Sequence, residues 1–256
     1  MLTLLSLPAF EDNYIWVFHD GKHAVAVDPG DPVPLIAFLD AHQLALTALL
    51  ITHHHRDHTG GNAALRQRYG CAIYAPDNPR IPAVTQTAHG GTLLDISQPR
   101  LHFDVLATPG HTLDHISYAG HGVVFCGDTV FGCGCGKLFE GTPAMMATSL
   151  DRILALPDAT QICCAHEYTL DNIDFAKTID GHNPALLERE RNDRAARAQG
   201  RPTLPSTLAL EKTTNPFLRF HDDDMRAFAI HTLNQPHPSP AEVFGAIRAA
   251  KDNWDG

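Results

Sequence analysis

An apolar run at residues 46–52 ends directly in the segment His53–His58, which reads HHHRDH. The run is typical of a buried strand, and functional side chains gather where loops leave the ends of such strands. The HxHxDH pattern within the segment places three imidazoles and one carboxylate in six residues, which packing alone does not explain. Imidazole and carboxylate donors suit zinc, iron or manganese better than magnesium, so the segment predicts a metal site.

The spacing of the pattern predicts which side chains share an ion. Alternate residues of an extended chain point the same way, so His53 and His55 converge on one metal while His54 points away. The chain then turns, and Asp57 and His58 can face a second metal. Gly60-Gly61 follows and permits a tight turn into the next helix.

Three further candidate ligands, His111, Asp128 and His166, each stand at the end of a predicted strand. A carboxylate such as Asp128 can bridge two ions, which gives each ion three or four protein ligands and leaves room for a shared water. An isolated histidine is more often structural or exposed than a ligand. That interpretation applies to His19, His23, His42, His89, His102, His121, His182, His231 and His237.

Composition narrows the possible partners and the compartment. The formal net charge of −10 argues against a protein that binds nucleic acid through its phosphates. No apolar stretch is long enough to span a bilayer, and the N-terminal MLTLLSLPAF is expected to be an edge strand and not a signal peptide. The six cysteines show no disulfide-scaffold spacing, and Cys133-Gly134-Cys135 differs from the CxxC of a structural zinc site. We therefore expect reduced thiols and a cytoplasmic protein.

Strands and helices alternate up to about residue 166, and only helices are expected beyond it. This change predicts an α/β domain at residues 1–166 and a helical domain at residues 167–256. The charge-rich run 188–201 is expected to be the solvated face of a helix. The predicted strands are 2–7, 14–18, 24–27, 46–52, 72–75, 101–107, 115–118, 123–126 and 161–164. The predicted helices are 33–42, 60–69, 143–156, 170–179, 183–199, 206–212 and 241–251.

Together, the HxHxDH pattern, the three later ligands and the strand order resemble the metallo-β-lactamase superfamily. The resemblance is closer still to glyoxalase II, the hydroxyacylglutathione hydrolases, and it covers essentially the whole chain. HxHxDH identifies only the superfamily, whereas the Gly-Cys-Gly-Lys segment, the helical tail and an Arg-x-x-Lys pair narrow it to this family. The matching segments are Thr108–Thr112, Gly127–Thr129, Gly134–Gly141, Ala165–Thr169, Asn215–Arg219 and Arg248–Asp252.

The resemblance implies an αββα sandwich followed by a smaller helical domain, with two divalent ions per chain. Zinc is the expected metal, and iron or manganese are alternatives. The resemblance assigns His53, His55 and His111 to the first ion, Asp57, His58 and His166 to the second, and Asp128 to both. It also implies a glutathione pocket that uses Lys137, Tyr168, Arg248 and Lys251. On spacing alone, Arg248 and Lys251 would instead be a solvated helix end.

The implied activity is hydrolysis of S-(2-hydroxyacyl)glutathione, such as S-D-lactoylglutathione, to D-lactate and glutathione, the second step of methylglyoxal detoxification. A hydroxide held between the two ions attacks the thioester carbonyl, and Asp57 and Asp128 are the catalytic carboxylates. A monomer without nucleic-acid or membrane partners is expected. The alternative is a mononuclear iron persulfide dioxygenase of the same superfamily, which would not need the helical tail.

Two positions depart from the pattern of glyoxalase II. Phe139 stands where some members have a tyrosine, so a hydroxyl contact is absent there. Asp114 stands where a glycine is common, which adds a carboxylate near the predicted metals.

Overall fold

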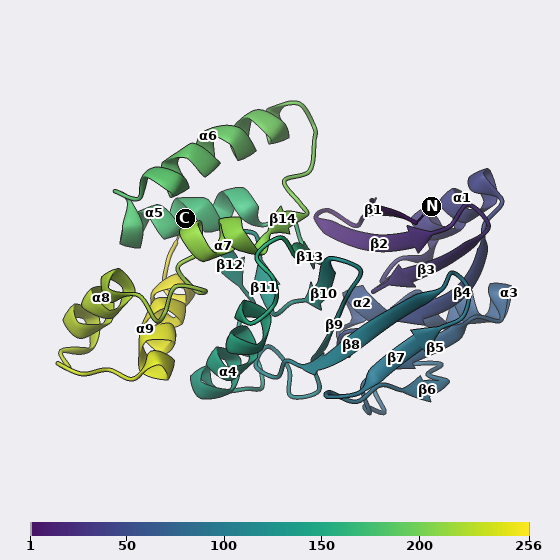
Figure 1. Ribbon diagram of the computed structural model, residues 1–256, viewed down its shortest axis with the longest axis horizontal. Coiled ribbons are helices and arrows are strands. Elements are labelled where there is room, and N and C mark those ends of the chain that lie inside the picture. The colour runs from purple at the N-terminus through teal and green to yellow at the C-terminus, as the bar shows by residue number, and fades with distance from the viewer. Residues whose placement is uncertain (1, 256) are drawn as a thin grey trace. The chain divides into compact units, whose positions relative to one another are not determined.

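The computed structural model describes residues 2–255 and divides them into two compact units (Figure 1). Unit 1 comprises the chain up to Ala107 together with Asp114–Gly127. Unit 2 comprises Thr108–Leu113 and the chain from Asp128 onward. This division follows contacts within the chain and differs from the sequence boundary at residue 166, which stays a prediction. The outer limits of the two predicted domains, residues 1 and 256, lie outside the described residues.

Unit 1 contains a six-stranded sheet whose strands follow their order in the sequence. The first pairs are antiparallel and those from β3 to β6 are parallel, with α1 (Pro32–His42) and α3 (Asn62–Tyr69) connecting parallel strands. β1 pairs only with β2, so it is the edge strand that the sequence predicts. The strands are β1 (Thr3–Ala9), β2 (Asn13–His19), β3 (His23–Val27), β4 (Ala45–Leu50), β5 (Ala72–Ala75) and β6 (Gln86–Thr87).

The core of this sheet is apolar because the two helices cover it with aliphatic side chains. Leu35 and Leu39 of α1 and Leu65 of α3 are buried in one cluster with Ile15 and Leu49. α1 begins where the sequence supplies a cap: the Asp31 carboxylate accepts from the backbone N–H two residues later, and proline occupies the first turn.

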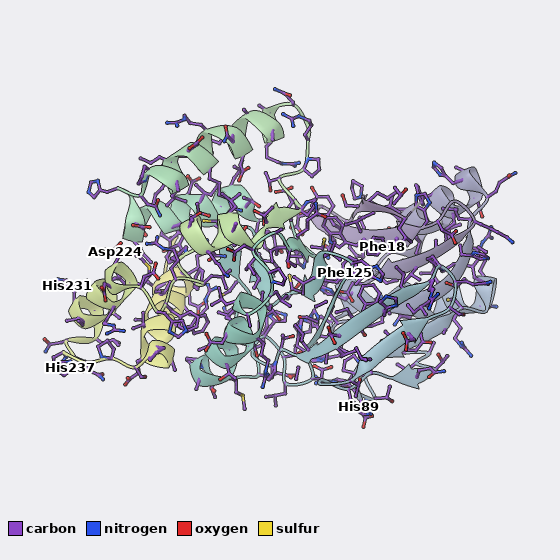
Figure 2. All side chains as sticks on the ribbon, viewed as in Figure 1. Phe18, His89, Phe125, Asp224, His231 and His237 are labelled. Atoms are coloured by element: carbon purple, nitrogen blue, oxygen red, sulfur yellow. The ribbon has the colours of Figure 1, made fainter. Side chains whose placement is uncertain are left out.

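Four consecutive antiparallel strands complete unit 1: β7 (Leu93–Ile96), β8 (Leu101–Ala107), β9 (Ile116–Gly120) and β10 (Val123–Gly127). Phe18 of β2 packs against Phe103 and Phe125 of these strands, with ring centroids 6.4 and 5.8 Å apart. Figure 2 shows Phe18 and Phe125 near each other inside the unit, whereas His89 projects from its edge. The Tyr118 hydroxyl donates to the Ile51 carbonyl at 2.9 Å, so the polar end of this buried ring is also satisfied.

Unit 2 is mainly helical. α5 packs against α6, and α9 packs against both α4 and α8. Sequence caps set several helix starts, including a capping box at Ser239 and Glu242 before α9. The elements are β11 (Val130–Phe131), β12 (Gly134–Cys135), α4 (Pro143–Leu154), β13 (Gln161–Cys164), α5 (Thr169–Asp180), α6 (Pro184–Ala198), β14 (Ser206–Thr207), α7 (Leu208–Thr214), α8 (Asp223–Leu233) and α9 (Pro240–Asp252).

Three sequence predictions need correction. Strands do not stop at residue 166, because β14 pairs antiparallel with β13. α8 was not predicted. The run 188–201 is not wholly solvated, because Arg189 is only 2% exposed and its guanidinium binds the buried Glu211 at 2.6 Å. Among residues 2–255, none of the helices combines the length and the apolar character needed to cross a membrane.

Candidate metal centre

The chain leaves β4, passes through the three consecutive histidines and enters the short helix α2 (Arg56–Thr59). A neighbouring loop lies in direct contact with this helix. A Cβ added to Gly30 would lie 1.8 Å from the carbonyl oxygen of Asp57, and one added to Gly60 would lie 2.5 Å from that of Gly30. Gly60 has an ordinary φ of −60°, so what requires glycine there is the close approach of the Gly30 carbonyl and not a left-handed backbone conformation.

Asp28, at the end of β3, organises the first half of the candidate site. Its carboxylate accepts from the Thr52 backbone N–H at 2.8 Å and from the Thr52 hydroxyl at 2.7 Å. The carboxylate also contacts a histidine ring, since His58 Nδ1 lies 3.1 Å from Asp28 Oδ2. Since the Thr52 hydroxyl donates its hydrogen to Asp28, its oxygen is left to accept from His53 Nδ1 at 3.0 Å.

This arrangement sets the tautomers of two histidines. His53 and His58 each carry a hydrogen on Nδ1, which leaves the Nε2 lone pair for a metal. Histidine ligands in proteins are oriented in this way by a hydrogen bond on the other ring nitrogen. Both side chains are fully buried, and their ring centroids lie 4.1 Å apart.

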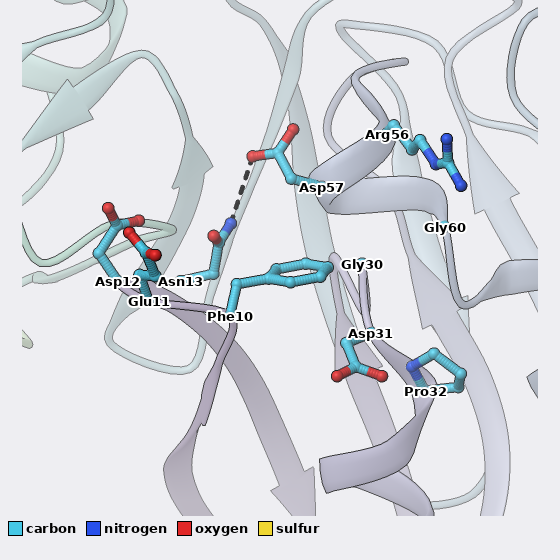
Figure 3. A pocket seen from close by; sticks show the side chains of 10 residues that line it. All are labelled: Phe10, Glu11, Asp12, Asn13, Gly30, Asp31, Pro32, Arg56, Asp57 and Gly60. Atoms are coloured by element: carbon cyan, nitrogen blue, oxygen red, sulfur yellow. Dashed lines mark hydrogen bonds between the residues drawn. The ribbon is translucent and has the colours of Figure 1, made fainter.

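Asp57 faces the same side of α2 as His58 and is held by an amide from β2. Asn13 Nδ2 donates to Asp57 Oδ2 at 3.3 Å, and that oxygen lies 3.2 Å from His58 Nε2. Figure 3 shows the hydrogen bond within a pocket that Phe10 and Arg56 also line. Asp57 retains 42% side-chain exposure, so it is the accessible carboxylate of this half.

The chain bends at His53 and His54, so the three consecutive histidines do not continue strand β4. The rings of His53 and His55 lie 4.7 Å apart. The Nδ1 of His54 instead lies 2.9 Å from Asp114 Oδ1.

Unit 2 holds the other three predicted ligands, with His111 and His166 both beside Asp128. His111 Nε2 lies 3.3 Å from Asp128 Oδ2, and His166 Nε2 lies 3.5 Å from Asp128 Oδ1. The two oxygens of one carboxylate thus face two different imidazoles. His111 Nδ1 donates to the Lys137 carbonyl at 2.8 Å, which leaves its Nε2 as the ligand atom. A Cβ on Gly136 would lie 1.9 Å from the Asp128 carbonyl oxygen, so this loop needs glycine to reach both ligands.

The donor atoms fit metal binding in their chemistry and their spacing. Two ligand atoms bound to one tetrahedral ion at about 2.0–2.1 Å lie roughly 3.3 Å apart. The separations within each unit are 3.2 Å in unit 1 and 3.3 and 3.5 Å in unit 2. A carboxylate with one imidazole beside each oxygen is the arrangement expected of a ligand shared by two ions.

The four predicted glutathione-binding residues all belong to unit 2. Arg248 is 7% exposed, and its Nη1 donates to the Cys135 carbonyl at 3.0 Å while Nη2 pairs with Asp252 at 3.0 Å. Lys251 pairs with Asp171 at 2.6 Å, and its ammonium lies 4.0 Å from the centroid of the Trp254 ring. Neither residue is therefore a solvated helix end.

The remaining two lie nearer the metal ligands. Tyr168 stacks on His166 with centroids 4.8 Å apart and is 37% exposed. Lys137 is exposed, and its ammonium lies 5.9 Å from the centroid of the exposed Phe139 ring. Burial raises the pKa of the Cys135 thiol to about 11, which favours its protonated form near neutral pH.

Sequence reasoning missed the residues that orient the ligands: Asp28, Thr52 and Asn13. A detectable signal was the position of an aspartate at the end of β3, beside the strand that leads into the histidines. Asn13 carries no comparable local signal because its partner is 44 residues away.

Comparisons with known proteins identify the family to which the chain belongs. Residues 9–166 match the metallo-beta-lactamase superfamily, and residues 167–254 match the hydroxyacylglutathione hydrolase C-terminus. A hydroxyacylglutathione hydrolase from Thiobacillus denitrificans is 73% identical over 100% of both chains. One from Nitrosomonas europaea is 44% identical over 100% of this chain and 98% of its own length.

Among solved structures, ETHE1 from Myxococcus xanthus aligns with a TM-score of 0.65 and 26% identity over 97% of both chains. The expected αββα sandwich and helical C-terminal region are thereby confirmed. The chain belongs to the hydroxyacylglutathione hydrolase family of the metallo-β-lactamase superfamily.

Proposed function

We propose that the chain hydrolyses S-(2-hydroxyacyl)glutathione, with S-D-lactoylglutathione as the expected substrate and D-lactate and glutathione as products. The observation that carries this proposal is the 73% identity, over the full length of both chains, to a hydroxyacylglutathione hydrolase. The match of residues 167–254 to the C-terminal region of that family supports it independently of the metal-ligand pattern.

The proposed site holds two divalent ions, with zinc expected and iron or manganese as alternatives. We propose that His53, His55 and His111 bind one ion and that Asp57, His58 and His166 bind the other. Asp128 is proposed to serve both ions, because each of its oxygens faces a different imidazole within unit 2. When bound, such ions lower the pKa of water and withdraw charge from a carbonyl oxygen.

Neighbouring side chains hold the proposed histidine ligands in their orientations. Asp28 fixes His58 directly and His53 through Thr52, so the imidazoles need not reorganise during the reaction. Asp57 is proposed to act mainly as a ligand, and its partly exposed carboxylate could also orient a water or take its proton.

The proposed glutathione pocket uses Lys137, Tyr168, Arg248 and Lys251. Glutathione carries two carboxylates, and cationic side chains form strong charge-assisted hydrogen bonds with such groups. Arg248 donates to the Cys135 carbonyl, two residues before Lys137, so two of the three cationic side chains come from adjoining segments of the chain. Lys251 would bind the substrate while sharing its charge with Asp171.

An iron persulfide dioxygenase remains the second candidate. The thioesterase is favoured, because the 73% identity to a hydroxyacylglutathione hydrolase extends over the full length of both chains. We also propose that the protein is a monomer in a reducing, cytoplasmic compartment. The six buried free cysteines fit such a compartment. The net charge of −10 does not favour nucleic acid as a partner.

The test is steady-state hydrolysis of S-D-lactoylglutathione by the metal-loaded protein, measured as the release of free thiol. We expect saturable hydrolysis, and oligomeric state is read from sedimentation of the same sample. Oxygen-dependent consumption of glutathione persulfide without thioester hydrolysis would favour the second candidate instead.

A further inference from the structure

His54 lies in the middle of the metal-binding segment but is directed at a carboxylate. Its Nδ1 lies 2.9 Å from Asp114 Oδ1, and the other carboxylate oxygen accepts from Asn78 Nδ2, also at 2.9 Å. The side chains of His54 and Asp114 are only 7% and 10% exposed. In such surroundings a hydrogen bond to an ionised group is worth more than at the surface, because water competes poorly for it.

Asn78 is held by its own loop, so it is a fixed support for this carboxylate. Its Oδ1 accepts from the Arg80 backbone N–H at 2.9 Å and from Arg80 Nε at 3.3 Å. Because that oxygen is occupied by donors, the amide is oriented with Nδ2 toward Asp114. The Asn78 backbone N–H also donates to the Pro76 carbonyl at 2.9 Å.

His54 connects this support to two proposed metal ligands. It is bonded through the main chain to His53 and His55, and its ring centroid lies 6.3 and 4.9 Å from theirs. Holding the ring of His54 therefore restricts the main-chain angles from which both ligands project. A loss of that restraint would let the two imidazoles leave the geometry that metal binding requires.

We propose that Asp114 is a positioning residue for the metal centre, acting through His54 to orient His53 and His55. This inference rests on the proposed metal site. Asp114 would stabilise the arrangement of the ligands before metal binds, and it is not one of the seven proposed ligands. Asn78 would keep the carboxylate in the rotamer that reaches His54.

The test is metal affinity of the full chain, measured by competition with a chelator for wild type, Asp114→Gly, His54→Ala and the double variant. Outer partners of metal ligands typically contribute 10- to 100-fold in metal affinity, and we expect a weakening of about that size in each single variant. Because Asp114 acts through His54, the double variant should be little weaker than either single variant. Additive effects, or unchanged affinity in Asp114→Gly, would overturn the proposal.

Two further measurements separate positioning from general destabilisation. Asp114→Asn keeps the shape of the side chain but loses its charge and one acceptor, so it should weaken affinity less than Asp114→Gly. Asp104→Asn on β8, where the side chain is exposed, is the matched control and should leave affinity unchanged. The visible spectrum of the cobalt-substituted protein should change in Asp114→Gly and not in the control, and an unchanged spectrum would count against the proposal. Since neither readout requires thioester hydrolysis, failure of the proposed function would be recognised separately.

Discussion

Glu211 forms the centre of a buried polar network in unit 2, and its removal should have a large effect on stability. The side chain is fully buried and accepts from Arg189 Nη2 and the Ser206 hydroxyl, both at 2.6 Å. It also accepts from the Cys133 backbone N–H at 2.9 Å and from Asn215 Nδ2 at 3.1 Å. Glu211→Ala would leave all four donors without this acceptor.

The magnitude follows from the burial of the pair. Removing one partner of a buried ion pair costs about 3–5 kcal/mol, because the other charge is left uncompensated. Arg189 keeps Asp193 and the Thr214 hydroxyl as partners, at 3.2 and 2.7 Å, which places the expected loss nearer about 3 kcal/mol. At roughly 2–4 °C per kcal/mol for a chain of this size, Tm should fall by about 6–12 °C.

The assay is thermal unfolding of the full chain by calorimetry, with Asp40→Ala as the control. Asp40 pairs with Arg68 at 2.8 Å, but both side chains are about half exposed, and such pairs contribute about 0–1 kcal/mol. Glu211→Gln keeps one acceptor and should lie between Glu211→Ala and wild type. If Glu211→Ala lowered Tm no more than Asp40→Ala, the stabilising role assigned to the network would be wrong.

Four further outcomes are expected. Removing metal with a chelator should abolish hydrolysis and zinc, iron or manganese should restore it, whereas full activity in verified metal-free protein would contradict the proposal. Asp128→Ala should lower metal content and kcat more than His54→Ala, since both oxygens of Asp128 face imidazoles; the reverse order in elemental analysis and kinetics would refute this. Arg248→Ala and Lys251→Ala should each raise KM for glutathione thioesters about tenfold to more than a hundredfold, with little change in kcat. Neither change should alter KM for a thioester that lacks the glycine carboxylate. Unchanged KM for the glutathione thioester would show that the two residues do not belong to the pocket. Burial raises the pKa of Cys133 to about 12, so above about pH 9 the folded chain keeps a proton that the unfolded chain loses. The free energy of unfolding should therefore fall by up to about 1.4 kcal/mol per pH unit. In urea titrations Cys133→Ala should show a smaller dependence of this free energy on pH, and an equal dependence would contradict the assignment.

Features encoded locally could be predicted from the sequence. The strand before His53 and the helices that begin at Pro32 and Pro143 were anticipated, because apolar runs and caps are read within a few residues. The candidate ligands were also found, since histidines and aspartates at strand ends are visible without a structure. The resemblance to a known family predicted a specific reaction, whereas the spacing of the residues predicted only a metal site.

Features that depend on distant partners could not be predicted. β14 has only two residues and exists through its pairing with β13, so no periodicity marks it. Arg189 lies in a charge-rich run, and only the fold shows that its partner Glu211 is buried 22 residues away. The role of Asp114 was likewise open, because neither His54 nor Asn78 is its neighbour in the sequence.

The central claim is that a two-metal site hydrolyses a glutathione thioester. It is tested most directly by following S-D-lactoylglutathione hydrolysis and oxygen uptake in one sample whose metal content per chain has been determined. The account predicts two divalent ions per chain, with release of glutathione and no oxygen uptake. One iron per chain, with oxygen uptake on glutathione persulfide and no thioester hydrolysis, would contradict it.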